Sequence, residues 1–422
     1  MLSLHRVTIH AIIAADLCFS SRLYMAILPD IAQRILLSTL LLVGLAYLGL
    51  ALMRGHVVPV LLFLLAGGLI IGQLIVYEVN WGMAANPTGV AQYTVVLTFI
   101  VFFVVGRDGL AEYAMRVLAM YALGYVCFYI AYVGAYFAGL LPPSFTGALL
   151  LRDIERGDRF FAYAGALAFS WYVALNRIRA RRTGGRLAVF GLCALANVLT
   201  LSRVYLACLA AVTILDLVRV PRAVIRIVCV GALCVVSSVL LYGLVDTRWN
   251  PFFALSGDDT SGIGRALEYQ IAQDLLARSP ILGLGLSSSP EQPGLLTGIP
   301  FFAASDLGMA GIVLDFGILG LSLFLIASWL ACTRPPILSG DQGDALNLTG
   351  CTLAMYGCIA PILFLPGGAF YFAAILGTWL AGNQSRGQAG DDPARPLTRI
   401  QSAASGEDVP TASPVIYFEQ TR

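Results

Sequence analysis

The stretch RLAVFGLCALANVLTLSRVYLACLAAVTILD, residues 186–216, is mostly apolar and has a single charged residue in its interior, Arg203. If residues 187–218 formed a single helix, that helix would be about 48 Å long, whereas the hydrocarbon core of a bilayer is about 30 Å thick. The stretch is therefore too long for one crossing. An unpaired guanidinium in the middle of a membrane would also be costly.

Arginine-rich segments flank this stretch on both sides, NRIRARRTGGR at 176–186 and RVPRAVIR at 219–226. Short loops rich in Arg stay on the cytoplasmic side of a membrane. Two loops on the same side require an even number of crossings between them. We therefore predict two short or tilted helices, with Arg203 at their turn on the outer side.

The composition points to a membrane protein. Of the 422 residues, 59% are hydrophobic and only 12% are charged, whereas soluble domains carry about 25% charged residues. Apolar runs of about 20 residues indicate helices, because the strands of a β-barrel would alternate polar and apolar residues. We predict an all-α, polytopic integral membrane protein with about twelve transmembrane helices, near residues 7–28, 35–53, 57–77, 88–105, 110–140, 160–175, 187–201, 204–218, 223–244, 308–331, 346–364 and 366–381.

Several function classes are disfavoured. The net charge of +2 argues against a nucleic-acid partner. Nine cysteines are scattered without a CxxC pair, and the three histidines all lie before residue 57. We therefore expect no metal site, no disulfide and no cofactor. The first apolar stretch is interrupted by His10, Asp16 and Arg22, so it does not form a clean signal peptide.

The same alternation of sides orients the other loops. Loops around Arg54, Arg107 and Arg334 are predicted in the cytoplasm, and segments 141–159 and 245–306 in the periplasm. We expect the catalytic residues to lie in or beside the longer segment, 245–306.

We divide the chain into a transmembrane domain, 1–385, which includes the periplasmic loop 245–306, and a tail, 386–422. The tail is polar and rich in Pro, Ala and Ser. This composition predicts disorder, and the tail is assigned to the cytoplasm.

A second arginine of interest lies in GIGRALEYQIAQDLLARSPILGLG, residues 262–285. Residues 266–278 fit an amphipathic helix, with an apolar face formed by Leu267, Ile271 and Leu275. Arg265 would then lie near the helix N-terminus, where backbone N–H groups also favour an anion. The alternative for Arg265 is an ordinary solvated loop residue, and for Arg203 a charge that anchors a helix end.

Two acidic residues lie in SDLGMAGIVLDFGILGL, residues 305–321. Asp306 is predicted at the outer mouth of a helix, where it could accept a proton or simply cap the helix. Asp315 lies two turns deeper and nearly opposite, and an acid inside a membrane helix is a functional candidate by default. We favour Asp306 as the catalytic carboxylate and expect Asp315 to pair with an Arg or a hydroxyl.

Two further groups are secondary candidates for binding substrate. The charged loop with Arg152, Arg156 and Arg159 could contact an acceptor glycan or a diphosphate, or could simply be solvated. Glu268 and Tyr269 could hold sugar, although Glu268 also fits a charge on the helix surface.

Together, LTLSR, the GR…E…SPILGLG loop and the helix-opening SDLGMAGIVLDFGILG resemble the bacterial O-antigen ligase and polysaccharide polymerase superfamily over about residues 187–325. The resemblance implies a GT-C-like membrane glycosyltransferase of the bacterial inner membrane. It also implies polyprenyl-diphosphate-linked glycans as substrates, no metal, and a flippase and a chain-length regulator as partners. Arg203 and Arg265 would hold the diphosphate.

The resemblance also separates two branches. Ligases of this family open the helix with a histidine, and Asp306 occupies that place here, with Gly317 and Gly320 at the following GxxG. A Ser-Asp followed by Gly can open this helix in polymerases. We therefore favour a polysaccharide polymerase, with a ligase as the alternative and a secondary transporter as a hypothesis from a different class.

Overall fold

The computed structural model describes residues 2–26, 29–82, 90–141, 149–153, 157–245, 260–286 and 307–390. Residues 1–383 form one compact unit, and the rest of the chain forms a separate one. The last helix continues to Gly390, and the remainder of the predicted tail lies outside the described residues.

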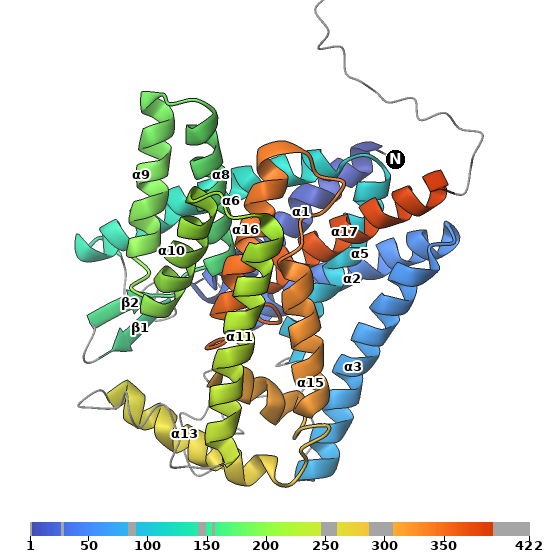
Figure 1. Ribbon diagram of the computed structural model, residues 1–422, viewed down its shortest axis with the longest axis vertical. Helices are drawn as coiled ribbons and strands as arrows, with labels where there is room; N and C mark the ends of the chain where they lie inside the picture. Colours follow the sequence, from blue (N-terminus) through green and yellow to red (C-terminus); the bar gives the residue numbers. More distant parts are fainter. Residues whose placement is uncertain are drawn as a thin grey trace, which may run out of the picture. The chain divides into compact units, whose positions relative to one another are not determined.

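The described residues are almost entirely helical, which confirms the predicted all-α polytopic class (Figure 1). Within these ranges, one short antiparallel hairpin accompanies the helices, formed by β1 (Leu150–Asp153) and β2 (Gly157–Phe160). The helical elements are α1 (Leu2–Ser20), η1 (Leu23–Ala26), α2 (Pro29–Met53), α3 (Val57–Trp81), η2 (Ala91–Thr98), α5 (Phe99–Arg107), α6 (Ala111–Phe137), α8 (Ala164–Ala180), α9 (Gly184–Val198), α10 (Arg203–Leu217), α11 (Arg222–Val245), α13 (Thr260–Leu276), α15 (Met309–Ala331), α16 (Gly340–Tyr356) and α17 (Ala369–Gly390).

Each of the twelve predicted spans overlaps a helical segment, although the span at 346–364 extends beyond α16, which ends at Tyr356. Within the described residues only six helices are long and apolar enough to cross a membrane. These six are α1, α2, α3, α6, α11 and α15. The predicted span at 88–105 is a 3₁₀ segment followed by α5, whose residues 99–106 are all buried. A segment enclosed by other helices does not need to be long enough to reach both lipid interfaces.

The predicted pair of short helices is present. α9 and α10 have 15 residues each, about 22 Å at the helical rise, and residues 199–202 join them. Leu201 in this turn has a left-handed φ of 52°. Arg203 is the first residue of α10, so the sequence correctly predicted both the break and the place of the arginine.

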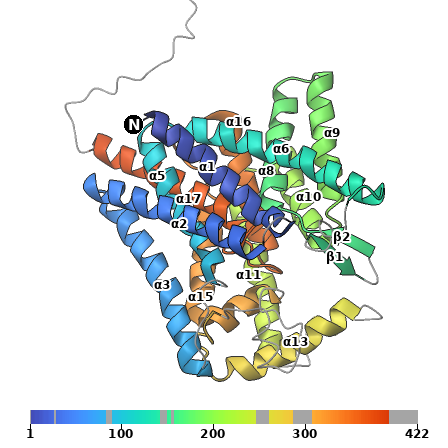
Figure 2. The same ribbon diagram turned by 180° about the vertical axis from the view of Figure 1, so that it is seen from behind.

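The core lies between the helices that surround α5, α8 and α16. α8 packs against α6, α9 and α16, and α1 packs against α2 and α6 (Figure 2). α3 and α11 carry many exposed apolar side chains, as expected for surfaces that face lipid.

The loops predicted to be cytoplasmic gather at one end of these helices. At the N-terminus, His5 Nε2 lies 2.9 Å from the carboxylate of Asp108, which also accepts a hydrogen bond of 2.8 Å from Arg54. Ser339 donates to Glu112, which joins the loop before α16 to the start of α6.

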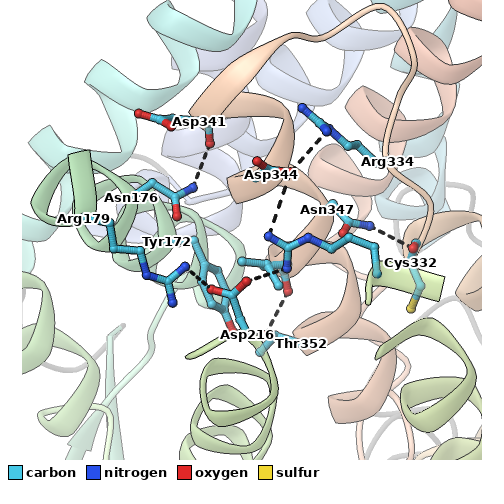
Figure 3. A network of polar contacts seen from close by, with 12 residues as sticks. Tyr172, Asn176, Arg179, Asp216, Cys332, Arg334, Asp341, Asp344, Asn347 and Thr352 are labelled. Carbon is cyan, nitrogen blue, oxygen red and sulfur yellow. Dashed lines mark hydrogen bonds and ion pairs between the residues drawn. The ribbon is translucent and has the colours of Figure 1, made fainter. Parts of the chain in front are cut away.

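A larger charge network lies at this same end (Figure 3). Asp216 accepts contacts from Arg179 at 2.5 Å and from Arg222 at 2.6 Å, and Arg222 also lies 3.9 Å from Asp344. Arg334 lies 3.3 Å from Asp344. These contacts tie α8, α10, α11 and α16 to the segment after α15, so Arg179, Arg222 and Arg334 are neutralised within the fold. We call it the ion-paired end.

Candidate functional site

The opposite end contains a broken helix. Within α15, Gly317 has φ 64° and ψ −162°, which interrupts the helix. This backbone conformation is open to glycine and strongly disfavoured for other residues. A Cβ at this position would lie 2.1 Å from the carbonyl oxygen of Ile281. Glycine is therefore required both for the turn of the chain and for the close approach of a second segment.

That second segment is residues 279–286, which we call the strap. Its backbone fills the break: Leu284 N donates to Leu314 O at 2.8 Å, and Gly285 N donates to Asp315 O at 3.1 Å. In return, Ile318 N donates to Pro280 O at 3.1 Å. The groups that the break would leave without partners are thus satisfied, which is obligatory inside a membrane.

The strap is also held from the other side by α3. Gln73 donates to the carbonyl of Leu282 at 3.1 Å, and Asn80 donates to the carbonyl of Gly283 at 3.2 Å. A Cβ at Gly285 would lie 2.3 Å from the backbone nitrogen of Tyr77. The SPILGLG motif is therefore a strip of backbone clamped between α3 and the broken α15.

Asp315 lies two residues before the break and is half-buried. Among the described residues, its carboxylate accepts no hydrogen bond and forms no ion pair, so the predicted pairing with an Arg or a hydroxyl is not found there. The next residue, Phe316, packs edge-on against Tyr93 at 5.8 Å. The carboxylate therefore lies in apolar surroundings at the one irregular point of this helix.

Arg203 begins α10 with an exposed side chain that, in the described ranges, forms no ion pair. The turn beneath it is rigid. Tyr129 of α6 donates to Leu199 O at 3.4 Å, and Tyr205 donates to the side chain of Asn197 at 2.8 Å. Among the described residues, Arg203 is thus an exposed guanidinium without an acidic partner on an ordered turn, which suits an anion-binding residue.

Arg265 lies on α13, but its predicted place within the helix is wrong. α13 begins at Thr260, so Arg265 is in the second turn rather than at the N-terminus with its free N–H groups. Its side chain is outside the described residues. α13 packs against α11 and α15, whereas the turn with Arg203 packs against α6. Whether the two guanidinium groups meet therefore stays a prediction.

The buried face of α13 is shifted from the predicted one: Leu275 is buried and Ile271 is half-buried, as predicted, but Leu267 is not. Leu267 is 42% exposed, whereas Glu268 and Tyr269 are only 4% and 1% exposed. Tyr269 and Leu275 pack in a cluster with residues of the strap and α15. Glu268 is thus not a charge on the helix surface. The apolar spacing at i, i+4 and i+8 drifts around a helix, and contact with α15 selected the adjacent stripe.

Other predicted site residues lie at the limits of the described structure. Asp306 and Arg156 are outside the described residues, although Leu307 and Gly308, which follow Asp306, are buried. Arg152 pairs in register with Asp158, and Arg159 with Leu151, within the hairpin. In the described ranges, no three His, Cys, Asp or Glu residues lie close enough to hold a metal ion.

The structure adds a buried cluster that the sequence reasoning missed. Asp16 near the end of α1 is 1% exposed and accepts hydrogen bonds from Ser20 at 2.8 Å and from the hydroxyl of Tyr163. The backbone N–H of Gly367 donates to Ser20 at 3.2 Å. This cluster joins α1, the start of α8 and the segment before α17. The only sign in the sequence was an isolated acid in an apolar run.

A comparison with known protein families matches the part of the chain that contains the α9–α10 turn and the strap. A family model described as O-antigen ligase matches residues 188–325, from α9 through the strap to beyond the break in α15. The resemblance to the O-antigen ligase and polysaccharide polymerase superfamily is thereby confirmed. No curated protein and no solved structure matches the chain.

The region that matches the O-antigen ligase family model contains two irregular features of the half of the fold opposite the ion-paired end. These are the α9–α10 turn with Arg203 and the strap in the break of α15. The family consists of membrane enzymes that act on lipid-linked glycans. Within the matched region, Gly317, Gly283 and Gly285 are required for the close packing of the strap against α15 and α3.

Proposed function

We propose that this protein is a polysaccharide polymerase of the bacterial inner membrane. It would join polyprenyl-diphosphate-linked oligosaccharide repeat units into exopolysaccharide, capsule or O-antigen on the periplasmic face. The observation that carries the proposal is Arg203, an exposed guanidinium with no acidic partner among the described residues. It lies on an ordered turn at the end opposite the paired arginines, within the region that matches the family.

The reaction would be a displacement at the anomeric carbon of the donor glycan. A hydroxyl at the non-reducing end of the acceptor attacks this carbon, and the bond to the diphosphate breaks. Arg203 and Arg265 would neutralise the departing polyprenyl diphosphate through bidentate hydrogen bonds. Asp306 would take the proton of the attacking hydroxyl. The product remains linked to the acceptor lipid.

The alternative is a ligase that transfers glycan to lipid A-core or to protein. The description of the matching family model favours this alternative. Asp306 favours the polymerase, because the resemblance places the ligase histidine at this position. The products separate the two. A deletion strain of a polymerase would accumulate single repeat units on the lipid carrier, whereas loss of a ligase would leave long lipid-linked polymer.

A secondary transporter is favoured by one observation, the broken helix α15, because broken helices form the binding sites of many transporters. In those sites the freed backbone groups face the substrate or the ion. Here the strap occupies them. Proton- or sodium-coupled sugar uptake in vesicles containing the protein would favour the transporter and contradict the polymerase.

The proposal is tested by Arg203→Ala in a deletion strain, with membrane insertion checked by immunoblot. We expect polymer to disappear and single lipid-linked repeat units to accumulate, because loss of one preorganised donor costs on the order of 100-fold or more in rate. Arg182→Ala is the matched control. Arg182 is also exposed, but it lies in the loop between α8 and α9 at the ion-paired end. Wild-type polymer length in Arg203→Ala would contradict the proposal.

A second comparison tests the assignment of the base. Asp306→Asn should abolish polymer, whereas Asp315→Asn should retain it. The reverse result would move the catalytic role to the carboxylate at the helix break. A flippase and a chain-length regulator are the partners that we propose for the assembled pathway.

A further inference from the structure

A third arginine lies at the same end as Arg203, in the turn after α1. Arg22 has a left-handed φ of 59°, a conformation that residues with a Cβ rarely adopt. The turn is defined by backbone hydrogen bonds from Arg22 N to Phe19 O at 3.0 Å and from Met25 N to Arg22 O at 3.0 Å. A glycine would fit this turn without strain, so the arginine side chain is retained against a backbone preference.

The guanidinium group of Arg22 is held by an aromatic ring. Its central carbon lies 3.8 Å from the centre of the Phe161 ring. A cation–π contact of this kind uses the flat face of the guanidinium and not the N–H donors at its edge. A guanidinium that is fixed in this way loses little freedom when it binds an anion.

The short segment after β2 connects Arg22 with the turn that carries Arg203. Arg22 stacks on Phe161, and Tyr205, two residues after Arg203, donates to the carbonyl of Ala164 at 3.3 Å. Phe161 and Ala164 are three residues apart, about 10 Å of extended chain. Both arginine-bearing turns therefore contact one short segment.

The neighbouring contacts on α6 agree with this placement. Phe160 packs against Tyr132 at 5.3 Å, and Tyr129, one turn earlier on α6, donates to Leu199 of the α9–α10 turn. Residues 160–164 are thus fixed between α1, α6 and α10.

We propose that Arg22 binds a phosphate of a polyprenyl-diphosphate glycan, at the same end of the protein as Arg203. The inference rests on the proposed function. A diphosphate offers more negative charge than one guanidinium satisfies, so two arginines on one ordered segment suit it. In a polymerase both substrates carry a diphosphate, and Arg22 could serve the departing donor lipid or the acceptor lipid.

The experiment measures binding of farnesyl diphosphate to the purified full-length protein in detergent, by calorimetry. The central variant is Arg22→Gly, which removes the charge and also relieves the left-handed turn, so that loss of folding does not explain a loss of binding. We expect the affinity to fall about tenfold, which corresponds to about 1.4 kcal/mol, or one of two binding sites to disappear.

The matched control is Arg219→Gly. Arg219 is an exposed arginine with the same φ of 59°, in the turn between α10 and α11 at the ion-paired end. This variant should bind as the wild type does. Phe161→Leu is a second test, because it removes the aromatic support and keeps the charge; its affinity should fall by less than that of Arg22→Gly.

Arg203→Ala separates this inference from the proposed function. If the wild type does not bind farnesyl diphosphate, or if Arg203→Ala binds it unchanged, the proposed function fails. If only Arg22→Gly and Phe161→Leu bind unchanged, the inference about Arg22 alone is overturned. The inference would also be overturned if Arg219→Gly lowered the affinity for farnesyl diphosphate as much as Arg22→Gly does, because binding would then follow net charge. It would likewise be overturned if phosphatidylglycerol competed for the site as well as farnesyl diphosphate does, because the site would then bind ordinary lipid headgroups.

The stoichiometry distinguishes the two possible sources of the phosphate. One bound farnesyl diphosphate, weakened by both Arg22→Gly and Arg203→Ala, would place the two arginines on the same departing diphosphate. Two bound molecules, of which each variant loses one, would place Arg22 on the acceptor lipid. Either result supports an anion site at Arg22.

Discussion

The arginines discussed above have different surroundings at the two ends of this protein. At the ion-paired end, Arg179 and Arg222 share the buried carboxylate of Asp216. At the other end, Arg203 stands exposed on its turn, and Arg22 stacks on a phenyl ring. The first end uses guanidinium groups to join helices. The turn that carries Arg203 is held by backbone and tyrosine hydrogen bonds instead, and Arg203 has no acidic partner among the described residues.

We therefore expect substitutions at the two ends to affect different properties, stability at the ion-paired end and ligand binding at the other. Removal of Asp216, or of an arginine paired with it, should cost stability, because these charges compensate one another inside the fold. Removal of the charge of Arg203 should cost binding and leave the fold intact. The predictions below test both statements.

The largest effect is expected for Gly317→Ala. The new Cβ would meet the carbonyl of Ile281 at 2.1 Å in a left-handed backbone conformation, so the strap could not occupy the break. We expect loss of folded protein in size-exclusion chromatography of detergent extracts. Gly67→Ala in α3, where a Cβ would meet nothing within 4 Å, should instead be tolerated or stabilise that helix by up to about 1 kcal/mol. A well-folded Gly317→Ala protein would mean that the strap is not clamped as described.

The next effect is expected for Asp216→Ala, which leaves two arginines without their shared partner. We expect the free energy of unfolding to fall by about 3 kcal/mol, measured as a lower Tm in detergent. Farnesyl diphosphate binding below the new Tm should be unchanged. Asp341→Ala is the control, because Asp341 is exposed and it is its backbone carbonyl that accepts from Asn176; its effect should stay within about 0.5 kcal/mol. A loss of farnesyl diphosphate binding in Asp216→Ala would contradict the statement that the ion-paired end contributes to stability and not to binding.

A smaller effect on stability is expected to distinguish Asp16 from Asp315, the two acidic residues inside α1 and α15. Asp16→Asn should lower stability by about 1–3 kcal/mol, because Asp16 accepts hydrogen bonds from Ser20 and Tyr163. Asp315→Asn should leave the Tm unchanged or raise it, because its carboxylate has no partner among the described residues. Equal losses in both variants, measured in the same detergent, would show that Asp315 has a partner in the part of the chain that the structure does not describe.

The smallest effect concerns pH at the ion-paired end. Burial, and then the nearby Arg107 and Arg54, lower the pKa of His56 below its usual 6.5. The folded protein therefore binds this proton less readily than the unfolded chain. The contribution of His56 to stability is complete above pH 6.5 and is lost as the pH falls through the lower pKa of the folded state. His56→Gln should reduce the fall in Tm between pH 7.5 and pH 5.5 by about 1 °C. An identical pH profile in the variant would contradict the lowered pKa.

Much of the layout was predictable from the sequence because it follows from length and charge. The two arginine-rich loops and a stretch too long for one crossing predicted the α9–α10 turn and the position of Arg203, and the structure has both. The number of full-length spans was less predictable. Apolar composition is the same for a helix that faces lipid and for one enclosed by other helices, such as α5.

The sequence by itself determined the membrane class, the resemblance to the O-antigen ligase and polysaccharide polymerase superfamily and the arginine on the turn. Hydropathy, charge bias and motif spacing are local properties of the chain. Only the tertiary structure decided which face of α13 is buried, that Gly317 and the strap form one clamped unit, and that Arg22 and Arg203 share a neighbouring segment. These features depend on contacts between residues far apart in the chain. Inside a membrane every backbone N–H and C=O group needs a hydrogen-bond partner, and at the break in α15 the strap supplies it. A sequence pattern does not show which distant segment will do so.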